Sequence, residues 1–190
     1  MPRPLRTEEP GATYHITSRG NRRMPIFTGD SDRRHFVRIV EFVVDRYRWR
    51  CHAYCLMTTH YHLLISTPET NLARGMQQLN GLFAQYFNRR HKVSGHLFQG
   101  RYYSVKVESE AHLLELFRYI ALNPVRAGRC HTPGRWPWSS YRFSIGLEPP
   151  PRFLSLALVE ECFGPNSERA RAGLRSFVGD LSEATELRAA

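Results

Sequence analysis

The sequence predicts an α+β protein whose strands and helices follow one another in the order β-α-β-β-α-β. Short segments alternate apolar and polar residues, as half-buried strands do. Longer segments repeat apolar residues every three or four positions, as amphipathic helices do. This order is that of the ferredoxin-like arrangement, an antiparallel four-stranded sheet with both helices on one face. We expect the other face to stay open, and a third helix and a small helical tail to follow.

The first strand is predicted over residues 12–18, where Tyr14 and Ile16 point to one face and His15 to the other. The first helix follows over about residues 30–47, with its apolar residues at helical spacing. Because the first and third strands are central neighbours in this topology, His15 should lie close to any polar side chains on the same face of the third strand.

The second and third strands are predicted over residues 50–57 and 60–67, joined by a tight turn. Side chains alternate along a strand, so His60 and His62 project from one face while Tyr61 points into the core. Two neutral imidazoles on one face can hold a divalent cation. A pair of solvated surface histidines is the simpler alternative when this motif is considered alone.

The cysteines are best explained as buried free thiols, because none form a C-x-x-C pair. Cys51 and Cys55 would share a face of the second strand, so a zinc site that includes both is an alternative.

The remaining elements are expected at the following positions: a helix over 71–92, a strand over 102–107, a helix over 109–122, a turn over 124–128, and tail helices over 155–162 and 167–179.

The third helix carries a tyrosine that lies away from its apolar face. At 100° per residue its apolar residues cluster on one side, whereas Tyr119 lies on the other side together with Asn123, one turn further on. Such a tyrosine is commonly a surface residue, and a tyrosine phenol is a weak nucleophile at neutral pH because its ordinary pKa is about 10. A metal held by His60 and His62, with Asn123 as a third ligand, would assist attack on a phosphate.

The charge distribution favours a nucleic-acid partner. The chain carries a net charge of +10, and 25 of its 27 basic residues are arginines. Residues 1–147 contain 22 Lys+Arg against 10 Asp+Glu, whereas residues 148–190 contain 5 against 7. Arginine suits both phosphate binding and stacking on bases. No apolar run is long enough to span a membrane and the N-terminus has no signal-peptide pattern, so we expect a cytoplasmic protein.

Several motifs together resemble the IS200-like single-tyrosine (Y1) HUH transposases, and most of all their REP-associated branch. The resemblance covers roughly residues 12–146 and rests on these segments: Tyr14–Asn21, Tyr54–His62, Gly95–Tyr102, Arg118–Gly128 and Trp136–Tyr141. Two positions depart from the family pattern: Thr58-Thr59 stand where Pro-Asn is usual, and Ala121 stands where His is common.

The resemblance implies metal-dependent cleavage and strand transfer of single-stranded, hairpin-containing DNA. Tyr119 would be the nucleophile that leaves a 5′-phosphotyrosine, and His60, His62 and Asn123 would hold Mg²⁺ or Mn²⁺. From the predicted strand order, His15 is a candidate for a group that supports the metal ligands or contacts the substrate, and a solvated surface histidine is the alternative. The DNA contacts are predicted at these positions: Arg19, Arg22, Arg23, Gln99, Arg101 and Arg126.

We expect residues 1–147 to form the HUH domain and residues 148–190 a short helical extension, in a monomer or a homodimer. The competing function is a non-catalytic nucleic-acid-binding module on the same fold. Such a module needs aromatic side chains on the open sheet face, where the strands instead place His15, His60 and His62.

Overall fold

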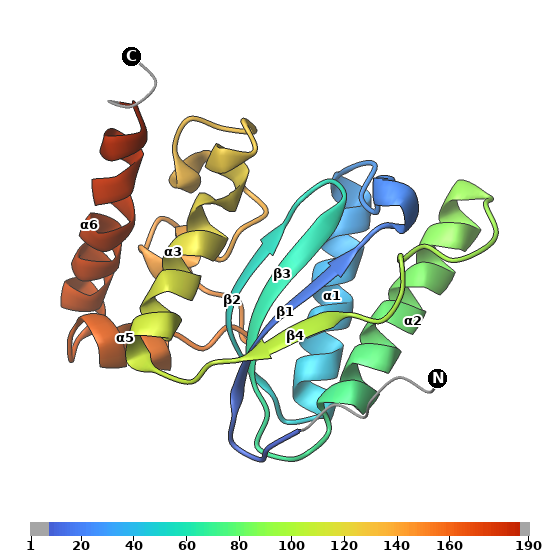
Figure 1. The fold of residues 1–190 in the computed structure, drawn as a ribbon, viewed down its shortest axis with the longest axis horizontal. Coiled ribbons are helices and arrows are strands. Elements are labelled where there is room, and N and C mark those ends of the chain that lie inside the picture. Colours follow the sequence, from blue (N-terminus) through green and yellow to red (C-terminus); the bar gives the residue numbers. More distant parts are fainter. Residues whose placement is uncertain (1–7, 187–190) are drawn as a thin grey trace.

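The computed structural model describes residues 8–186, with side chains up to residue 179. Its sheet contains four antiparallel strands in the order β2-β3-β1-β4 (Figure 1). Their bounds are Thr13–Arg19 for β1, Arg50–Leu56 for β2, His60–Ser66 for β3 and Tyr103–Lys106 for β4. This topology confirms the predicted ferredoxin-like arrangement, including the central position of β1 beside β3.

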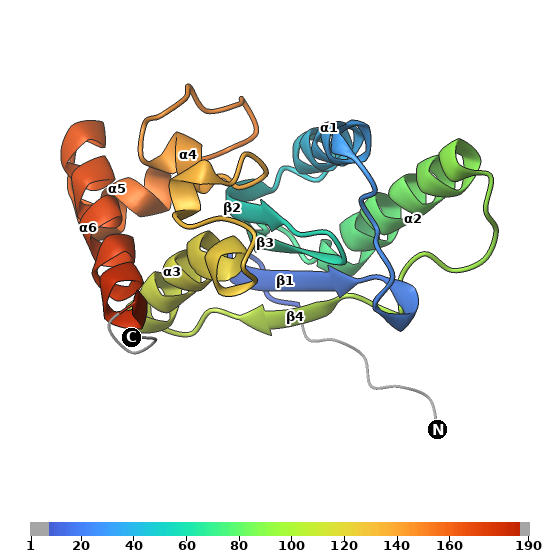
Figure 2. The same cartoon turned by 90° about the horizontal axis from the view of Figure 1, so that it is seen from above.

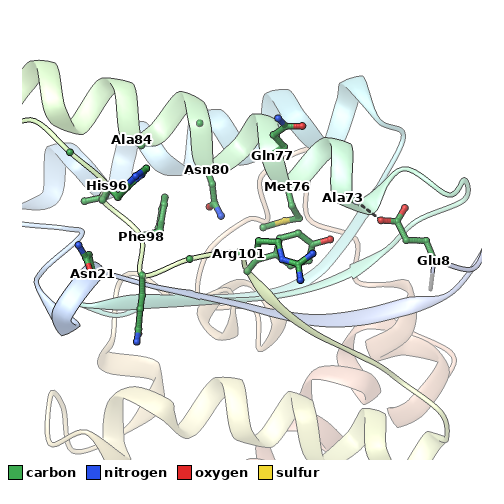
Figure 3. A pocket seen from close by; sticks show the side chains of 16 residues that line it. Glu8, Asn21, Ala73, Met76, Gln77, Asn80, Ala84, His96, Phe98 and Arg101 are labelled. Atoms are coloured by element: carbon green, nitrogen blue, oxygen red, sulfur yellow. Dashed lines mark hydrogen bonds between the residues drawn. The ribbon is translucent and has the colours of Figure 1, made fainter. Parts of the chain in front are cut away.

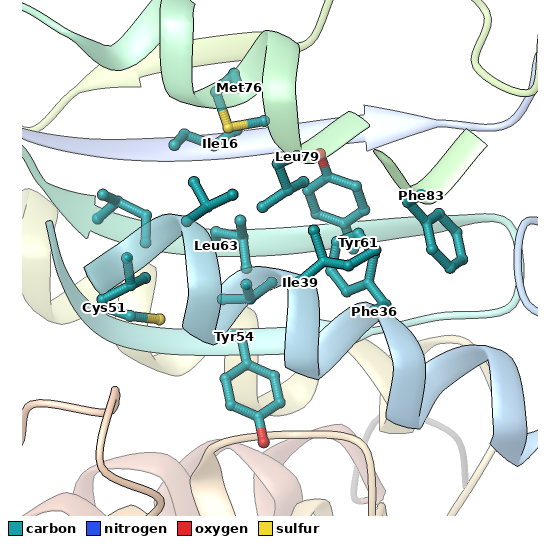
Figure 4. Packing of buried hydrophobic residues seen from close by; sticks show 14 of the residues in the cluster. Ile16, Phe36, Ile39, Cys51, Tyr54, Tyr61, Leu63, Met76, Leu79 and Phe83 are labelled. Carbon is teal, nitrogen blue, oxygen red and sulfur yellow. The ribbon is translucent and has the colours of Figure 1, made fainter. Parts of the chain in front are cut away.

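Helices α1 (Asp30–Arg46) and α2 (Leu72–His91) cover one face of the sheet (Figure 2). Between them and the sheet lies the first hydrophobic core (Figure 4), to which β3 contributes Tyr61 and Leu63, each fully buried. Phe36 of α1 packs against Tyr61 with ring centroids 4.6 Å apart. The alternation of the strands therefore directs Tyr61 into this core, as predicted, and His60 and His62 to the opposite side.

The opposite face of the sheet is not fully open, which corrects that expectation. Helix α3 (Glu110–Arg126) packs on the β2 side of this face and forms a second core with α5 (Ala157–Phe163) and α6 (Ser167–Glu186). The sheet contributes Ala53, Cys55 and Leu64 to this core, and Met57, directly after β2, also belongs to it. These apolar side chains point away from the first core and need a cover of their own. Short elements complete the fold: η1 (Asn21–Arg23), η2 (Pro133–Arg135) and α4 (Tyr141–Ser144).

Helix α3 continues through Pro124, so the predicted turn at this position is wrong. The helix ends one turn later, where Gly128 adopts a left-handed backbone with φ of 63°. The Gly128 N–H donates to the Val125 carbonyl and the Arg129 N–H donates to the Pro124 carbonyl, the pair of hydrogen bonds of a Schellman motif. Because the helix extends past Asn123, this residue keeps a regular helical position one turn after Tyr119.

Cys51 and Cys55 do not share a strand face, so a zinc site containing both is wrong. The pairing of β2 with β3 shifts register between Cys51 and Ala53, which inserts one extra residue. An extra residue reverses the side to which all later side chains point. Cys51 therefore belongs to the first core and Cys55 to the second. Across residues 8–186, no helix combines the length and hydropathy that crossing a membrane requires.

Candidate active site

The register of the central strands places the histidine pair. On β3, His62 lies opposite Thr17 of β1, and His60 lies opposite Arg19. The rings of His60 and His62 are 5.0 Å apart and nearly perpendicular. The ring of His15 stacks on that of His62 at 5.2 Å, because cross-strand diagonal neighbours on one face lie within reach of each other.

Helix α3 brings Tyr119 to these histidines. Its apolar residues Leu116, Phe117 and Ile120 are buried in the second core, which fixes the rotation of the helix about its axis. Tyr119 then faces the two central strands with 37% of its surface exposed, and its ring lies 5.3 Å from that of His62. The tyrosine and the histidine pair of one chain therefore meet on one side of the sheet.

Hydrogen bonds hold the Nδ1 atom of each histidine of the pair. His62 Nδ1 lies 3.1 Å from Thr17 Oγ1 and 3.0 Å from His15 Nε2. His60 Nδ1 lies 3.1 Å from Thr59 Oγ1. Such contacts orient the ring and select the tautomer of a metal-binding histidine. His62 Nε2 is buried, and within the described residues it has no hydrogen-bond partner.

The three imidazoles are poor bases in this site. Burial, with the nearby Arg19 charge, lowers the pKa of His60 to about 4, and hydrogen bonding to Asn123 opposes this shift. Burial also lowers the pKa of His15 to about 4, with His112 adding to the effect, and it places the pKa of His62 well below its ordinary value. At neutral pH these three imidazoles are therefore uncharged, and the neutral imidazole is the form that binds metals.

These residues fit a divalent cation. His62 offers an unpartnered buried nitrogen, His60 is oriented through its other nitrogen, and Asn123 contacts His60 from α3. A set of two imidazoles and one amide leaves coordination positions for phosphate and water. No cluster of three histidine, cysteine or acidic side chains suited to a metal occurs among the side chains that the structure describes, those of residues 8–179. A site with three protein ligands would therefore need the amide of Asn123.

A pocket of about 470 Å³, which we call the active-site pocket, lies beside Tyr119 and His62. Of the predicted DNA contacts, Arg19, Gln99 and Arg101 line this pocket. The Arg126 guanidinium lies 5.7 Å from the centre of the Tyr119 ring. These cationic and amide groups can receive a phosphate or a base edge next to the tyrosine.

Arg22 and Arg23 do not line the active-site pocket. They occupy the exposed turn η1 after β1, with φ values of 52° and 60° in the left-handed region. The backbone N–H of Gly20 before this turn donates to the Thr59 carbonyl, and that of Asn21 donates to the Leu97 carbonyl. The turn therefore connects the histidine hairpin with the loop that carries Gln99 and Arg101.

Thr17 and Thr59 were not singled out by the sequence as site residues. Thr17 could have been found, because it shares a strand face with His15 and lies directly opposite His62. Thr59 gave no such signal. Its hydroxyl reaches His60 only because the two-residue turn folds back, with the Met57 N–H donating to the His60 carbonyl at 2.9 Å.

Comparison with known proteins identifies the relatives of the chain. A family model described as "Transposase IS200 like" matches residues 10–123, a range that contains both histidines, Tyr119 and Asn123. A Haemophilus influenzae protein named as a REP-associated tyrosine transposase is 27% identical over an alignment of 116 residues, and the match covers 55% of this chain. The match spans 65% of that relative, just under two thirds of its length.

A solved structure of a REP-associated tyrosine transposase bound to a REP hairpin is also similar, with a TM-score of 0.64 and 19% identity. The match covers 82% of this chain and 92% of that one. At this identity the similarity establishes a shared fold, so the roles of individual residues must be argued from the site itself.

Proposed function

This chain belongs to the family of IS200-like transposases, and on that premise we propose that it cleaves and rejoins single-stranded DNA with Tyr119 as nucleophile. The observation that carries the proposal is the position of Tyr119. Its ring lies 5.3 Å from that of His62, whose buried Nε2 has no partner in the described chain. An exposed phenol beside a buried imidazole nitrogen that could hold a metal is an arrangement suited to phosphoryl transfer to tyrosine.

The reaction is a transfer of a phosphodiester from a DNA strand to the protein. The Tyr119 oxygen forms a bond to phosphorus while the bond from phosphorus to the 3′ oxygen of the strand breaks. The phenol proton passes to solvent, and the released 3′ oxygen takes up a proton from solvent. The products are a 5′-phosphotyrosine and a free 3′-hydroxyl. The reverse reaction with another 3′-hydroxyl rejoins DNA without ATP, because the phosphotyrosine conserves the bond energy.

The protein side chains position the phosphate for this attack. His60, His62 and Asn123 would hold Mg²⁺ or Mn²⁺, which supplies neutralisation of the phosphate charge when bound. Arg126, near the Tyr119 ring, stabilises negative charge on the oxygen as the phenol proton leaves. In this proposal Tyr119, His60, His62 and Asn123 all come from one chain, so a monomer would contain all four groups.

The DNA substrate is proposed to contain a hairpin. The similar structure of a REP-associated tyrosine transposase holds a REP hairpin, and the two chains share their fold. The arginine-rich composition and the arginines beside the active-site pocket of this chain suit a phosphate backbone. We propose single-stranded DNA with hairpin structure as the partner, with Arg19 and Arg101 contacting the strand near the cleaved bond.

A covalent adduct tests this function. The protein is incubated with Mn²⁺ and a hairpin oligonucleotide whose strand is labelled on the 3′ side of the expected cleavage site, and denaturing gels detect protein that carries the label. We expect an adduct with the wild type and none with Tyr119→Phe. Tyr103→Phe is a matched control, because Tyr103 lines the same pocket and is 66% exposed. An adduct that persists in Tyr119→Phe would refute the assignment of the nucleophile.

The histidine pair is tested separately. The double variant His60→Ala/His62→Ala should lose cleavage while it retains most DNA binding, because the phosphate and base contacts of the arginines remain. Binding without any adduct, in the wild type and on every hairpin and metal tried, would instead favour the non-catalytic binding module.

A further inference from the structure

The turn between β2 and β3 consists of Thr58 and Thr59 and leads directly into His60. The Thr59 hydroxyl lies 3.1 Å from His60 Nδ1, so the position of the turn decides how this ring is oriented. The turn lies beyond the residues that pair in the sheet, because β2 ends at Leu56 and β3 begins at His60. Other segments of the chain therefore have to hold the turn in place.

On one side the turn is bound by the residue that follows β1. The Gly20 N–H donates to the Thr59 carbonyl at 2.8 Å. The next residue, Asn21, lines a pocket of about 1030 Å³ between α2 and residues 95–102 (Figure 3). The chain on this side borders open space, so closer packing has to come from the other side.

On the other side two segments bind the turn and the strand before it. The Phe27 N–H donates to the Thr58 carbonyl at 3.2 Å. The Leu56 N–H donates to the Trp138 carbonyl at 2.8 Å, and the Trp136 indole N–H donates to the Leu56 carbonyl at 3.2 Å. Phe27, Trp136 and Trp138 thus belong to the segments that hold the turn.

The rings of these three residues, which we call the aromatic cage, surround Arg33 of α1. The guanidinium carbon lies 5.7 Å from the centre of the Phe27 ring, 5.8 Å from that of Trp136 and 5.6 Å from that of Trp138. All three distances are within the range of cation–π attraction, which strengthens where water is excluded. Arg33 is only 8% exposed, so one buried cation attracts rings from both segments.

A charged residue at this buried position carries a cost. Arg33 Nε is buried and has no hydrogen-bond partner among the described residues, and Nη1 lies 3.5 Å from Asp30 Oδ1, a long hydrogen bond. Burial lowers the pKa of Arg33, and the charges of Asp30 and Asp32 oppose this shift. An apolar side chain of similar length would fill the space without an unpaired donor. This cost indicates that the charge serves a purpose other than filling the core.

We propose that Arg33 is a positioning residue for the metal site: its charge holds the aromatic cage, the cage holds the turn of Thr58 and Thr59, and the turn orients His60. This proposal rests on the proposed function, because His60 needs a fixed orientation as a metal ligand. A cation is attracted to the face of each ring and so favours one arrangement of the cage. Apolar contact has no such preferred direction.

A role in packing alone is the competing explanation. Trp138 packs against the first core and Trp136 against the second, so Arg33 lies where the two cores approach each other. If Arg33 only filled this space, removing its charge would change the stability of the whole fold or change nothing. If Arg33 positions the turn, removing its charge loosens the turn selectively and weakens metal binding.

Amide hydrogen exchange of the metal-free protein separates the two roles. Arg33→Met keeps the unbranched stem and removes the charge. Arg34→Met is the matched control, because Arg34 is the next residue of the same helix, is exposed, and contacts the Ser31 hydroxyl at 3.4 Å. The same proteins are titrated with Mn²⁺ by calorimetry in the absence of DNA.

Four amides report on the two ends of the sheet. The N–H groups of Phe27 and Leu56 form hydrogen bonds beside the turn, whereas those of Thr67 and Val107 bind carbonyls at the start of β1 or just before it. In Arg33→Met we expect exchange to become about tenfold faster at Phe27 and Leu56 and to stay unchanged at Thr67 and Val107. Arg34→Met should match the wild type at all four amides.

The Mn²⁺ affinity of Arg33→Met should fall about threefold to tenfold, less than for the loss of a group that contacts a metal ligand directly. Arg33→Lys keeps a cation within the aromatic cage and should recover most of both losses. If Arg33→Met does not fold, Trp138→Leu provides the same test, because it removes one ring of the cage and keeps the backbone carbonyl that binds Leu56.

Exchange that rises equally at all four amides, or at none, would overturn the proposal. An unchanged Mn²⁺ affinity, or a lysine variant no better than the methionine variant, would overturn it as well. None of these measurements uses DNA or Tyr119. If they give the expected results and the wild type still forms no covalent adduct, the proposed function is contradicted and the positioning role of Arg33 stands.

Discussion

Asp32 joins the two helices that cover the first core, and replacing it by Asn should destabilise the fold. Its side chain is 1% exposed, and Oδ2 accepts hydrogen bonds from the Thr28 N–H at 2.9 Å and the Thr28 hydroxyl at 2.8 Å. Oδ1 lies 3.1 Å from His91 Nε2 and 3.3 Å from Arg90 Nε. One carboxylate therefore connects the first turn of α1 to the last turn of α2.

Asp32→Asn preserves the volume and removes the charge, and its amide N–H groups would face other donors. Hydrogen bonds to a charged group contribute about 1.5–3 kcal/mol each, and breaking a buried charge pair costs about 3–5 kcal/mol. Because Arg90 is half exposed, we expect a loss near the lower end, about 3 kcal/mol, from the free energy of unfolding in urea at pH 7. Asp30→Asn is the matched control. Its side chain is 62% exposed, so its loss should stay below about 0.5 kcal/mol.

The contribution of Asp32 should depend on pH. Burial raises the pKa of Asp32, but the hydrogen bonds from Thr28 and the contact with His91 outweigh this effect and the pKa is lowered overall. A carboxyl group with a lowered pKa in the folded state stabilises the fold above its unfolded pKa of about 3.9. This stabilisation is lost as the pH falls below that value and through the folded pKa. The stability difference between wild type and Asp32→Asn should thus be full at pH 7 and shrink below about pH 4. A loss under about 1 kcal/mol at pH 7, or a difference unchanged in acid, would refute this reasoning.

Two further predictions concern the orientation of His62 and the packing of α2. Thr17→Val removes the hydroxyl that holds His62 Nδ1, and it should weaken Mn²⁺ binding about tenfold or more, as measured by calorimetry. Thr13→Val is the control, because it loses a hydroxyl contact with Ser66 on the same strand face and should leave Mn²⁺ binding unchanged. Equal Mn²⁺ affinities of the two variants would contradict the role of Thr17. Gly75→Ala should lower the free energy of unfolding by about 1–3 kcal/mol, because its Cβ would lie 2.1 Å from the Trp49 ring. Gly81→Ala should raise the free energy of unfolding by up to about 1 kcal/mol, because its Cβ would meet no other atom. Changes of the same sign for both variants in urea unfolding would contradict the packing argument.

Local patterns were sufficient to predict the order of elements and to place His60, His62 and Tyr119 on the same side of the sheet. The alternation around His60 and His62 and the displayed position of Tyr119 depend only on backbone periodicity, which the residues themselves reveal. Features that arise from packing between distant segments were not predicted. The cover over the β2 side of the sheet requires α5 and α6 to dock onto α3, and the register shift after Cys51 leaves no mark in the alternation of an almost fully buried strand. In such a strand both faces are apolar, so a one-residue slip changes no visible pattern.

The second core also explains how Tyr119 reaches the histidines from sixty residues away in the sequence. Its helix is held between the sheet and α6, where Arg118 stacks on Phe177 at 3.6 Å and donates from Nε to the Phe177 carbonyl at 3.1 Å. Arg118 directly precedes Tyr119, so the residue that anchors the tail is the neighbour of the proposed nucleophile on the same helix. Moving α3 to another molecule would expose the apolar faces of both the sheet and α6. The helical tail therefore favours a site in which Tyr119 and the histidines come from the same chain.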